Sequence, residues 1–438
     1  MTDERTQPTP DPASFMRGMT SRRMSRRNML KYAGMGAGSL SLASILAACS
    51  KSSTTTGPGG QTSGAAMPNY DPSVAGTTVN FSNWPLYIDK ARVNGETVYP
   101  SLEQFKTETG ITVNYNDEIN DNAQFFGELL PQLQAGADVG RDIIVITNGR
   151  ELSALIRNGW VSELDASRRP NFDANAALWA QNPFYDDGNK YTMAWQSGLT
   201  GIGYNSDLVL APITSMDDLM DPNKVPPASV GVLKADAPDL VMINFGIDPL
   251  TSTPDQWQEA ANWLIKLRDS STFRIAYDQG YVTDLTNKNL AATMAWSGDV
   301  LYYKIWEGYP FEFIVPGPGT ETTGGALLWI DNMMIPANSA NPAGSLEMMD
   351  FFYRPEIAQM VTEWVLYMSP VPAVQELIAQ HAKDAVNPDV AAALKDTATS
   401  PMLWPDEQLL AQVSLGRQLD TDAEIQEWDS IFATIWEG

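Results

Sequence analysis

Apolar runs alternate with helical patterns over the first part of the folded chain, and this order limits the fold more than any other feature. In sequence come a strand-like run at 77–81, a helical pattern at 101–109, a run at 111–115, a second helix ending near Gly136, and a buried run at 142–146. The first helix stops at Gly110, a residue suited to a helix C-terminus. The βαβαβ order predicts an α/β protein with a mostly parallel sheet whose faces are covered by helices. Ligands of such sheets bind beyond the carboxyl ends of the strands, where Trp84 and Thr147 fall.

A second informative stretch lies at 324–338, where a largely apolar run is bounded by two glycines and a proline. It is expected to form a buried strand of the parallel sheet, which would have no solvent face, so an acid in its middle needs a reason. Trp329 and Asp331 are two residues apart, which places both side chains on one face of a strand. Together they offer an aromatic ring and a carboxylate, a combination that suits an organic cation. The alternative is a core tryptophan beside a structural aspartate.

The middle of the chain continues the α/β pattern, and the last third becomes helical. Further strands are expected at 200–205, 230–233, 290–296 and 311–315, and helices at 254–270, 298–308, 344–353, 355–364 and 371–381.

Charge and length restrict the partners. The chain of 438 residues is long enough for two folded units and carries a formal net charge of −25. So acidic a protein is not expected to bind nucleic acid or an anionic membrane surface. The spacing of its His, Cys, Asp and Glu residues predicts no metal site, and no cofactor motif is present.

The N-terminus has the pattern of an export signal. Ser25-Arg26-Arg27-Asn28-Met29-Leu30-Lys31 precedes an apolar, glycine-rich run that is too short to form a stable membrane span. The motif resembles a twin-arginine signal, and Leu46-Ala47-Ala48-Cys49 resembles a lipobox with Cys49 as the lipidated residue. Residues 1–48 are therefore expected to be a signal peptide and 49–75 a flexible tether. Because Cys49 is the only cysteine, no intrachain disulfide can form.

The body carries a set of motifs in a recognisable order: Asn83-Trp84 with Tyr87, Leu102-Glu103-Gln104-Phe105, Asp142-Ile143-Ile144-Val145, Gly201-Ile202-Gly203-Tyr204-Asn205, Met294-Ala295-Trp296-Ser297-Gly298-Asp299, Trp329-Ile330-Asp331 and Ile335-Pro336-Ala337-Asn338. In these motifs the chain resembles the spermidine/putrescine-binding proteins of ABC importers, which have the type 2 periplasmic-binding fold. The resemblance implies two α/β lobes around a hinged cleft, each with a mostly parallel sheet flanked by helices. The expected lobes are 76–198 with 330–372, and 199–329 with 373–438.

The resemblance also implies a ligand site. Trp84 and Tyr87 match aromatic cleft residues, Trp296 matches a stacking tryptophan, and Trp329 matches an aromatic wall. Asp331, Asp299 and the pair Asp236 and Asp239 match acids that hold amines. The sequence departs from the family pattern in three places: Leu86 replaces an acid, Thr147-Asn148-Gly149 replaces a motif containing tyrosine, and about ten residues are inserted around 90–98.

The residues leave several readings open. Trp84 and Trp296 could be core residues, and Asp236 and Asp299 could cap helices. The expected function is capture of a polyamine by a monomeric, membrane-anchored binding protein that delivers it to a permease. One alternative is a hydrolase that uses paired acids such as Asp236 and Asp331 on a glycan. Another is a sensor co-receptor on the same fold.

Overall fold

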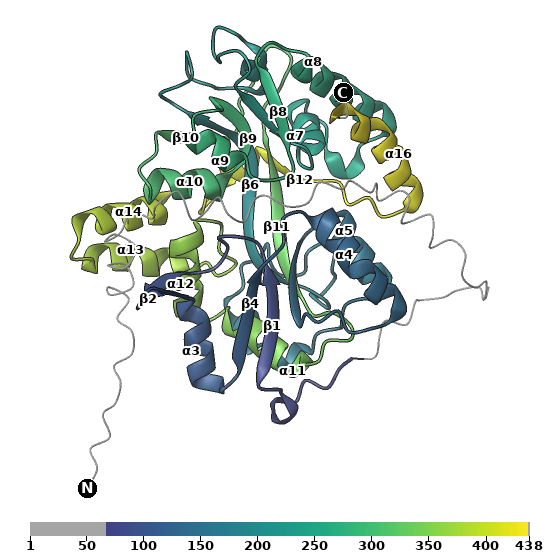
Figure 1. Cartoon of the computed structure of the whole chain (residues 1–438), viewed down its shortest axis with the longest axis vertical. Helices are drawn as coiled ribbons and strands as arrows, with labels where there is room; N and C mark the ends of the chain where they lie inside the picture. The colour runs from purple at the N-terminus through teal and green to yellow at the C-terminus, as the bar shows by residue number, and fades with distance from the viewer. Residues whose placement is uncertain (1–66, 437–438) are drawn as a thin grey trace.

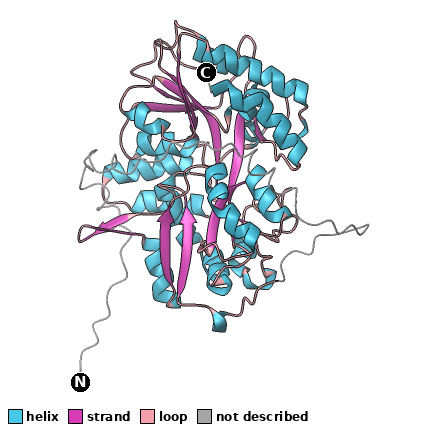
Figure 2. Ribbon diagram, turned by 45° about the vertical axis from the view of Figure 1, so that its right-hand side comes forward, coloured by secondary structure: helices cyan, strands magenta, loops and turns pink. Residues whose placement is uncertain are grey.

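Ten strands form one sheet that runs through both halves of the molecule (Figure 1). The computed structural model describes residues 67–436, so the predicted signal 1–48, Cys49 and most of the predicted tether lie outside the described residues. The strand order is β4-β1-β5-β11-β6-β9-β7-β8, with β10 paired to β6 and β12 paired to β11. Helices lie on both faces of the sheet (Figure 2). The fold is thus the predicted two-lobed α/β architecture.

The first lobe is built on the βαβαβ unit that the sequence predicts. Its elements are β1 (Thr78–Asn83), α3 (Pro100–Thr109), β4 (Thr112–Asp117), α4 (Asn122–Ala135) and β5 (Ile143–Thr147). Strand β1 is parallel to β4 and to β5. Gly110 and Gly136 end the two helices with φ values of 77° and 63°, a left-handed conformation that glycine adopts without steric cost. This unit, α5 (Arg150–Arg157) and α11 (Pro342–Phe351) form the lower half of Figure 1.

The second lobe repeats the principle in the upper half of Figure 1. Its strands are β7 (Val230–Leu233), β8 (Phe273–Tyr277), β9 (Ala292–Trp296) and β10 (Phe311–Ile314), and its helices include α7 (Ala237–Asn244), α8 (Pro254–Arg268), α9 (Tyr281–Thr286) and α10 (Ser297–Ile305). Strand β7 is parallel to both β8 and β9.

Two long strands, β6 (Met193–Asn205) and β11 (Ala326–Met334), cross from one lobe to the other. The expectation that β11 is parallel to its sheet neighbours is wrong for β5 and β6, to which it runs antiparallel, although the short β12 (Val413–Leu415) pairs with it in parallel. Apolar content alone showed that the strand is buried, whereas its direction follows from the crossing between lobes. Trp329 lies opposite Gly198, where a Cβ atom would come within 2.4 Å of the Trp329 ring. The glycine therefore makes room for the indole.

The C-terminal segment divides between the lobes. Helices α12 (Pro355–Val365), α13 (Val374–Asp384) and α14 (Pro388–Thr399) contribute buried residues to the core that contains β1 and β5. After α15 (Glu407–Leu410) and β12 (Val413–Leu415), α16 (Asp422–Phe432) packs on α8 in the second lobe. The expected boundary at residue 373 assigns α13 and α14 to the second lobe, whereas their buried side chains lie in the core of the first.

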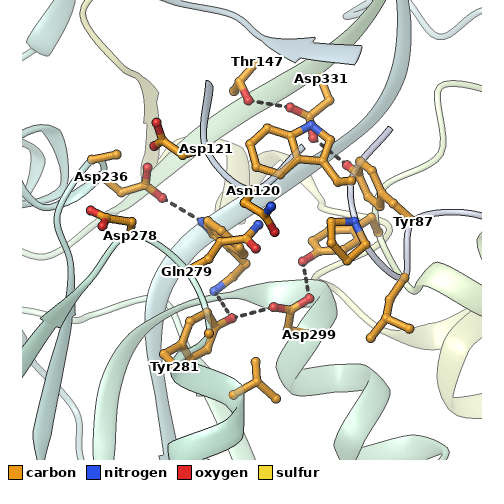
Figure 3. Close-up of a pocket in the computed structure, with 18 of the residues that line it drawn as sticks. Tyr87, Asn120, Asp121, Thr147, Asp236, Asp278, Gln279, Tyr281, Asp299 and Asp331 are labelled. Atoms are coloured by element: carbon orange, nitrogen blue, oxygen red, sulfur yellow. Dashed lines mark hydrogen bonds between the residues drawn. The ribbon is translucent and has the colours of Figure 1, made fainter. Parts of the chain in front are cut away.

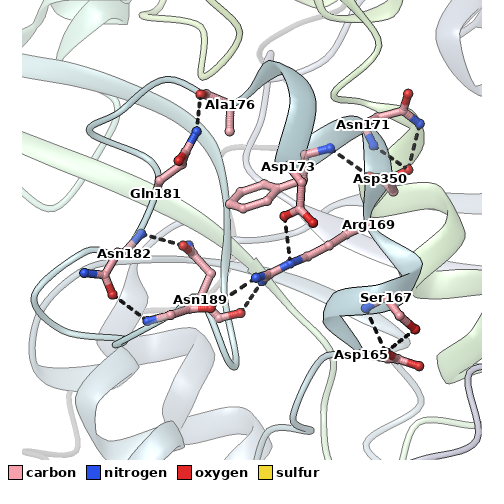
Figure 4. Close-up of polar contacts among 12 residues, drawn as sticks. Asp165, Ser167, Arg169, Asn171, Asp173, Ala176, Gln181, Asn182, Asn189 and Asp350 are labelled. Carbon is pink, nitrogen blue, oxygen red and sulfur yellow. Dashed lines mark hydrogen bonds and ion pairs between the residues drawn. The ribbon is translucent and has the colours of Figure 1, made fainter.

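Two excursions complete the first lobe. The predicted insertion forms a hairpin of β2 (Ala91–Val93) and β3 (Glu96–Val98). Between α5 and β6, α6 (Pro170–Asn175) and a polar loop are held by Arg169, which donates to the backbone carbonyls of Gly188 and Asn189 (Figure 4). Asn171 donates to Asp350 of α11, which fastens the start of α6 to the lobe.

Candidate functional site

A cavity of about 300 Å³ lies where the two lobes meet at the crossing strands. Residues after β1 and β4, together with Thr147 at the end of β5, line it from the first lobe, and residues after β7, β8 and β9 line it from the second. Five aspartates and eight aromatic residues are among the lining side chains: Asp121, Asp236, Asp278, Asp299, Asp331, Trp84, Tyr87, Tyr281, Trp296, Tyr302, Tyr303, Trp329 and Tyr367 (Figure 3). None of the described residues that line the cavity is a lysine or an arginine.

Asp331 is the most buried of these acids, with 5% of its surface exposed. It accepts hydrogen bonds from the hydroxyl of Thr147 to Oδ1 at 2.6 Å and from the hydroxyl of Tyr87 to Oδ2 at 2.8 Å. Burial raises the pKa of Asp331 to about 6, although both hydrogen bonds act in the opposite direction. The sheet thus holds the Asp331 carboxylate at a fixed position, although burial makes its ionised form unfavourable. A bound cation would stabilise the ionised form.

Asp299 lies in the first turn of α10 between two tyrosines. The hydroxyls of Tyr367 and Tyr281 donate to its two oxygens at 2.8 and 2.9 Å. The Tyr281 hydroxyl also accepts a hydrogen bond from the backbone N–H of Trp296 at 2.9 Å. Burial raises the pKa of Asp299 above its usual range. Tyr281 therefore fixes the position of both the acid and the start of the helix that carries it.

Asp236 follows β7 and occupies the N-cap position of α7, but its side chain makes no capping hydrogen bond. Its Oδ2 accepts from the hydroxyl of Thr200 at 2.5 Å and from Nε1 of Trp296 at 2.8 Å. The position of a helix cap and a place in the cleft are therefore combined in one residue. Burial raises the pKa of Asp236.

Asp239, predicted to act with Asp236, lies outside the cavity. Helix α7 begins at Ala237 and places the Asp239 side chain beneath the C-terminal segment, where it accepts from the backbone N–H of Arg417 at 3.3 Å. Burial raises the pKa of Asp239 to about 7. The structure therefore separates these two acids, while it brings the other predicted site residues together.

The aromatic walls come from both lobes. Trp84 donates from Nε1 to the carbonyl of Val145, which orients its ring against the end of β5. The ring of Tyr367 lies 5.3 Å from those of Tyr87 and Trp329. Trp296 and Trp329 pack against the cores of both lobes as well as lining the cavity. Packing and exposure to the cleft are thus compatible roles for these tryptophans.

Several residues that line the cavity are not among those predicted from the sequence. Asp121 precedes α4 directly and could have been found from the rule that strand ends face the ligand. Asp278 follows β8 in the same way, but its strand was not expected. Tyr281 and Tyr367 carry no local signal, because only the packing of α9 and α12 brings them to Asp299.

The chemistry of the cavity is acidic and aromatic. Within residues 67–436 no group of three or more His, Cys, Asp or Glu side chains could hold a metal ion.

Among the helices of residues 67–436, none is long and apolar enough to cross a membrane.

Comparison with known proteins places this geometry in a family. A family model described as bacterial extracellular solute-binding protein matches residues 101–395. The putrescine-binding periplasmic protein PotF of Escherichia coli is 27% identical over 72% of this chain and 82% of its own. The spermidine/putrescine-binding periplasmic protein of Salmonella typhimurium is 27% identical over 76% of this chain and 85% of its own.

A solved structure confirms the fold. The spermidine/putrescine ABC transporter substrate-binding protein PotD of Streptococcus pneumoniae superimposes with a TM-score of 0.63 at 22% identity, over 82% of this chain and 98% of its own. Because the family model covers more than half of the sequence, the chain belongs to the family of bacterial extracellular solute-binding proteins.

Proposed function

We propose that the protein binds a polyamine, such as putrescine or spermidine, outside the cytoplasm and delivers it to the permease of an ABC importer. The observation that carries this proposal is the composition of the cavity, which presents five aspartates and eight aromatic rings without a basic residue among its described lining.

Each part of a polyamine has a counterpart in this cavity. An ammonium group binds a carboxylate by charge-assisted hydrogen bonds, which are about twice as strong as neutral ones. The methylene groups need apolar walls, and Trp or Tyr rings provide them while attracting the neighbouring charge by about 0.5–2 kcal/mol. The relatives named above are described as binding putrescine or spermidine, which supports the same ligand class here.

The binding role is preferred to the hydrolase alternative because the family consists of solute-binding proteins. The residues proposed to bind the ligand are Trp84, Tyr87, Thr147, Asp236, Trp296, Asp299, Trp329 and Asp331, joined by Asp121, Tyr281 and Tyr367. Asp239 is left out of this set because its side chain lies beneath Arg417.

Export by the twin-arginine route and lipidation at Cys49 are part of the proposal. They rest on the motifs at 25–31 and 46–49. Replacing Cys49 with serine should release the protein from membranes into the soluble fraction. A Cys49→Ser protein that stays in the membrane fraction would contradict a lipid anchor.

A thermal-shift panel tests the ligand class. Putrescine, cadaverine, spermidine, spermine and a set of amino acids are added to the purified protein, because a ligand that binds only the folded state raises the melting temperature. Polyamines should stabilise the protein and neutral amino acids should not. If no polyamine changes the melting temperature, the proposal is wrong. A parallel assay for glycan turnover separates binding from hydrolysis.

A further inference from the structure

The outer part of the cavity carries acids from both lobes. Asp121 lies directly before α4 in the first lobe, and Asp236 lies between β7 and α7 in the second. Both line the cavity, and Figure 3 shows them grouped with Asp278, apart from Asp331 and Asp299. The cavity therefore has an inner acidic end, formed by Asp331 of the crossing strand β11 and Asp299 of α10, and an outer acidic end that spans the interface between lobes.

Each of the two outer acids keeps one oxygen for a ligand. Oδ1 of Asp121 accepts from the backbone N–H of Gln124 at 2.7 Å and so caps α4. Both hydrogen bonds to Asp236, from Thr200 and Trp296, end on Oδ2. In the described chain, Oδ2 of Asp121 and Oδ1 of Asp236 receive no such bond, and both carboxylates face the same cavity.

The electrostatics of this end favour a cation. The pKa of Asp236 is raised mainly by burial and further by the charge of Asp121, and the pKa of Asp121 is raised by burial and by Asp278. Lys234 offsets part of this charge through its ion pair with Asp278 at 3.2 Å. That pair lies within the second lobe, so it does not join the lobes to each other. A cation held between Asp121 and Asp236 would join the two lobes.

We infer that the outer ammonium of the ligand binds between Asp121 of one lobe and Asp236 of the other, so that this cation links the two lobes. The inference rests on the proposed function. It assigns to Asp121 the role that the family resemblance implies for Asp239. It also makes the second cation of the ligand a requirement for tight binding, since an amine with one charge can occupy only one end of the cavity.

The variant Asp121→Asn tests this assignment cleanly. Asparagine caps helices about as well as aspartate, so the change removes the charge and keeps the start of α4. Isothermal titration with putrescine, spermidine and butylamine compares two, three and one cationic groups. The affinity for putrescine and spermidine should fall about tenfold or more, as expected for loss of a charge-assisted contact, while butylamine binding changes less than about twofold. The melting temperature of the ligand-free variant should stay that of the unmodified protein.

Asp239→Asn is the matched control, because it neutralises the acid that the sequence had paired with Asp236. It should leave the affinity for all three amines unchanged. Unchanged polyamine affinity in Asp121→Asn, or an equal loss for butylamine, would overturn the inference while leaving the proposed function intact. Absence of polyamine binding by the unmodified protein would instead overturn both.

Discussion

Asp331 is the residue on which the proposed function depends most directly. Asparagine keeps its shape but removes the charge, so a buried ammonium would lose its partner. The expected loss in binding free energy is about 2–5 kcal/mol, measured by titration with spermidine. The ligand-free variant should melt no lower than the unmodified protein, because the aspartate is charged there at a cost. Unchanged polyamine affinity together with a large drop in melting temperature would show that Asp331 is a structural residue.

The raised pKa of Asp331 also predicts how the free energy of unfolding changes with pH. The pKa of Asp331 is about 6 in the folded protein and about 3.9 in an unfolded chain. Between these values the folded state holds the extra proton, so the free energy of unfolding falls as pH rises. The stability that the Asp331 proton contributes to the folded state is fully present below about pH 4 and is lost above about pH 6.

Polyamine binding should be linked to the same proton. A cation favours the ionised carboxylate, so binding near pH 6 should release a proton and affinity should rise from pH 5.5 to 7.5. Titration calorimetry in two buffers of different ionisation heat measures the proton count. The Asp331→Asn variant is the control and should lose this release. Equal affinity and no proton release across that range would argue against Asp331 as the ammonium partner.

At the scale of elements, helix α10 shows how the aromatic site limits the backbone. A glycine within a helix is usually destabilising by about 0.5–1 kcal/mol relative to alanine. At Gly298, however, a Cβ atom would lie 2.5 Å from the ring of Tyr367. Gly298→Ala should therefore destabilise the protein by about 1–3 kcal/mol, as overpacking does, and weaken polyamine binding by displacing Tyr367.

Gly127 in α4 is the control for this change, because no atom lies within 4 Å of the position its Cβ would take. Gly127→Ala should be neutral or stabilising. Urea unfolding of both variants makes the comparison, and equal effects of the two substitutions would show that the contact with Tyr367 is not limiting.

The elements also explain what the sequence could predict. Gly110 and Gly136 mark helix ends through their own conformational preference, so the βαβαβ unit was visible from local pattern. The direction of β11 was not, because it depends on how the chain crosses between lobes. Asp236 and Asp239 are three residues apart, but only Asp236 precedes the helix, and the first turn of α7 carries Asp239 under Arg417. Tyr281 and Tyr367 reach Asp299 through tertiary packing, which leaves no trace in local spacing.

For the whole molecule, the two lobes are joined by more than the crossing strands. Arg150 of α5 in the first lobe forms an ion pair with Asp429 of α16 in the second, with 3.0 Å between Nη1 and Oδ1. Arg157 donates to the backbone carbonyl of Asp420 at 2.6 Å on the same side. These contacts connect the lobes through residues that are not among those lining the cavity. We expect them to favour a closed arrangement, in which the two lobes lie together around the cavity, even when no ligand is present.

Asp429→Asn weakens this connection without removing Arg150, which also lies 3.8 Å from Glu151. A partly exposed ion pair contributes about 0.2–1 kcal/mol, so the closed population of the ligand-free protein should decrease modestly. Small-angle scattering should show a larger radius of gyration than for the unmodified protein. Polyamine affinity should fall about two- to fivefold, because part of the binding free energy is then used to close the lobes. Saturating spermidine should restore the compact form, since the ligand contacts both lobes. Glu427→Gln, on an exposed position of the same helix, should change neither quantity. If Asp429→Asn scatters and binds like the unmodified protein, the ion pair does not influence closure, and the crossing strands alone set the equilibrium between the lobes.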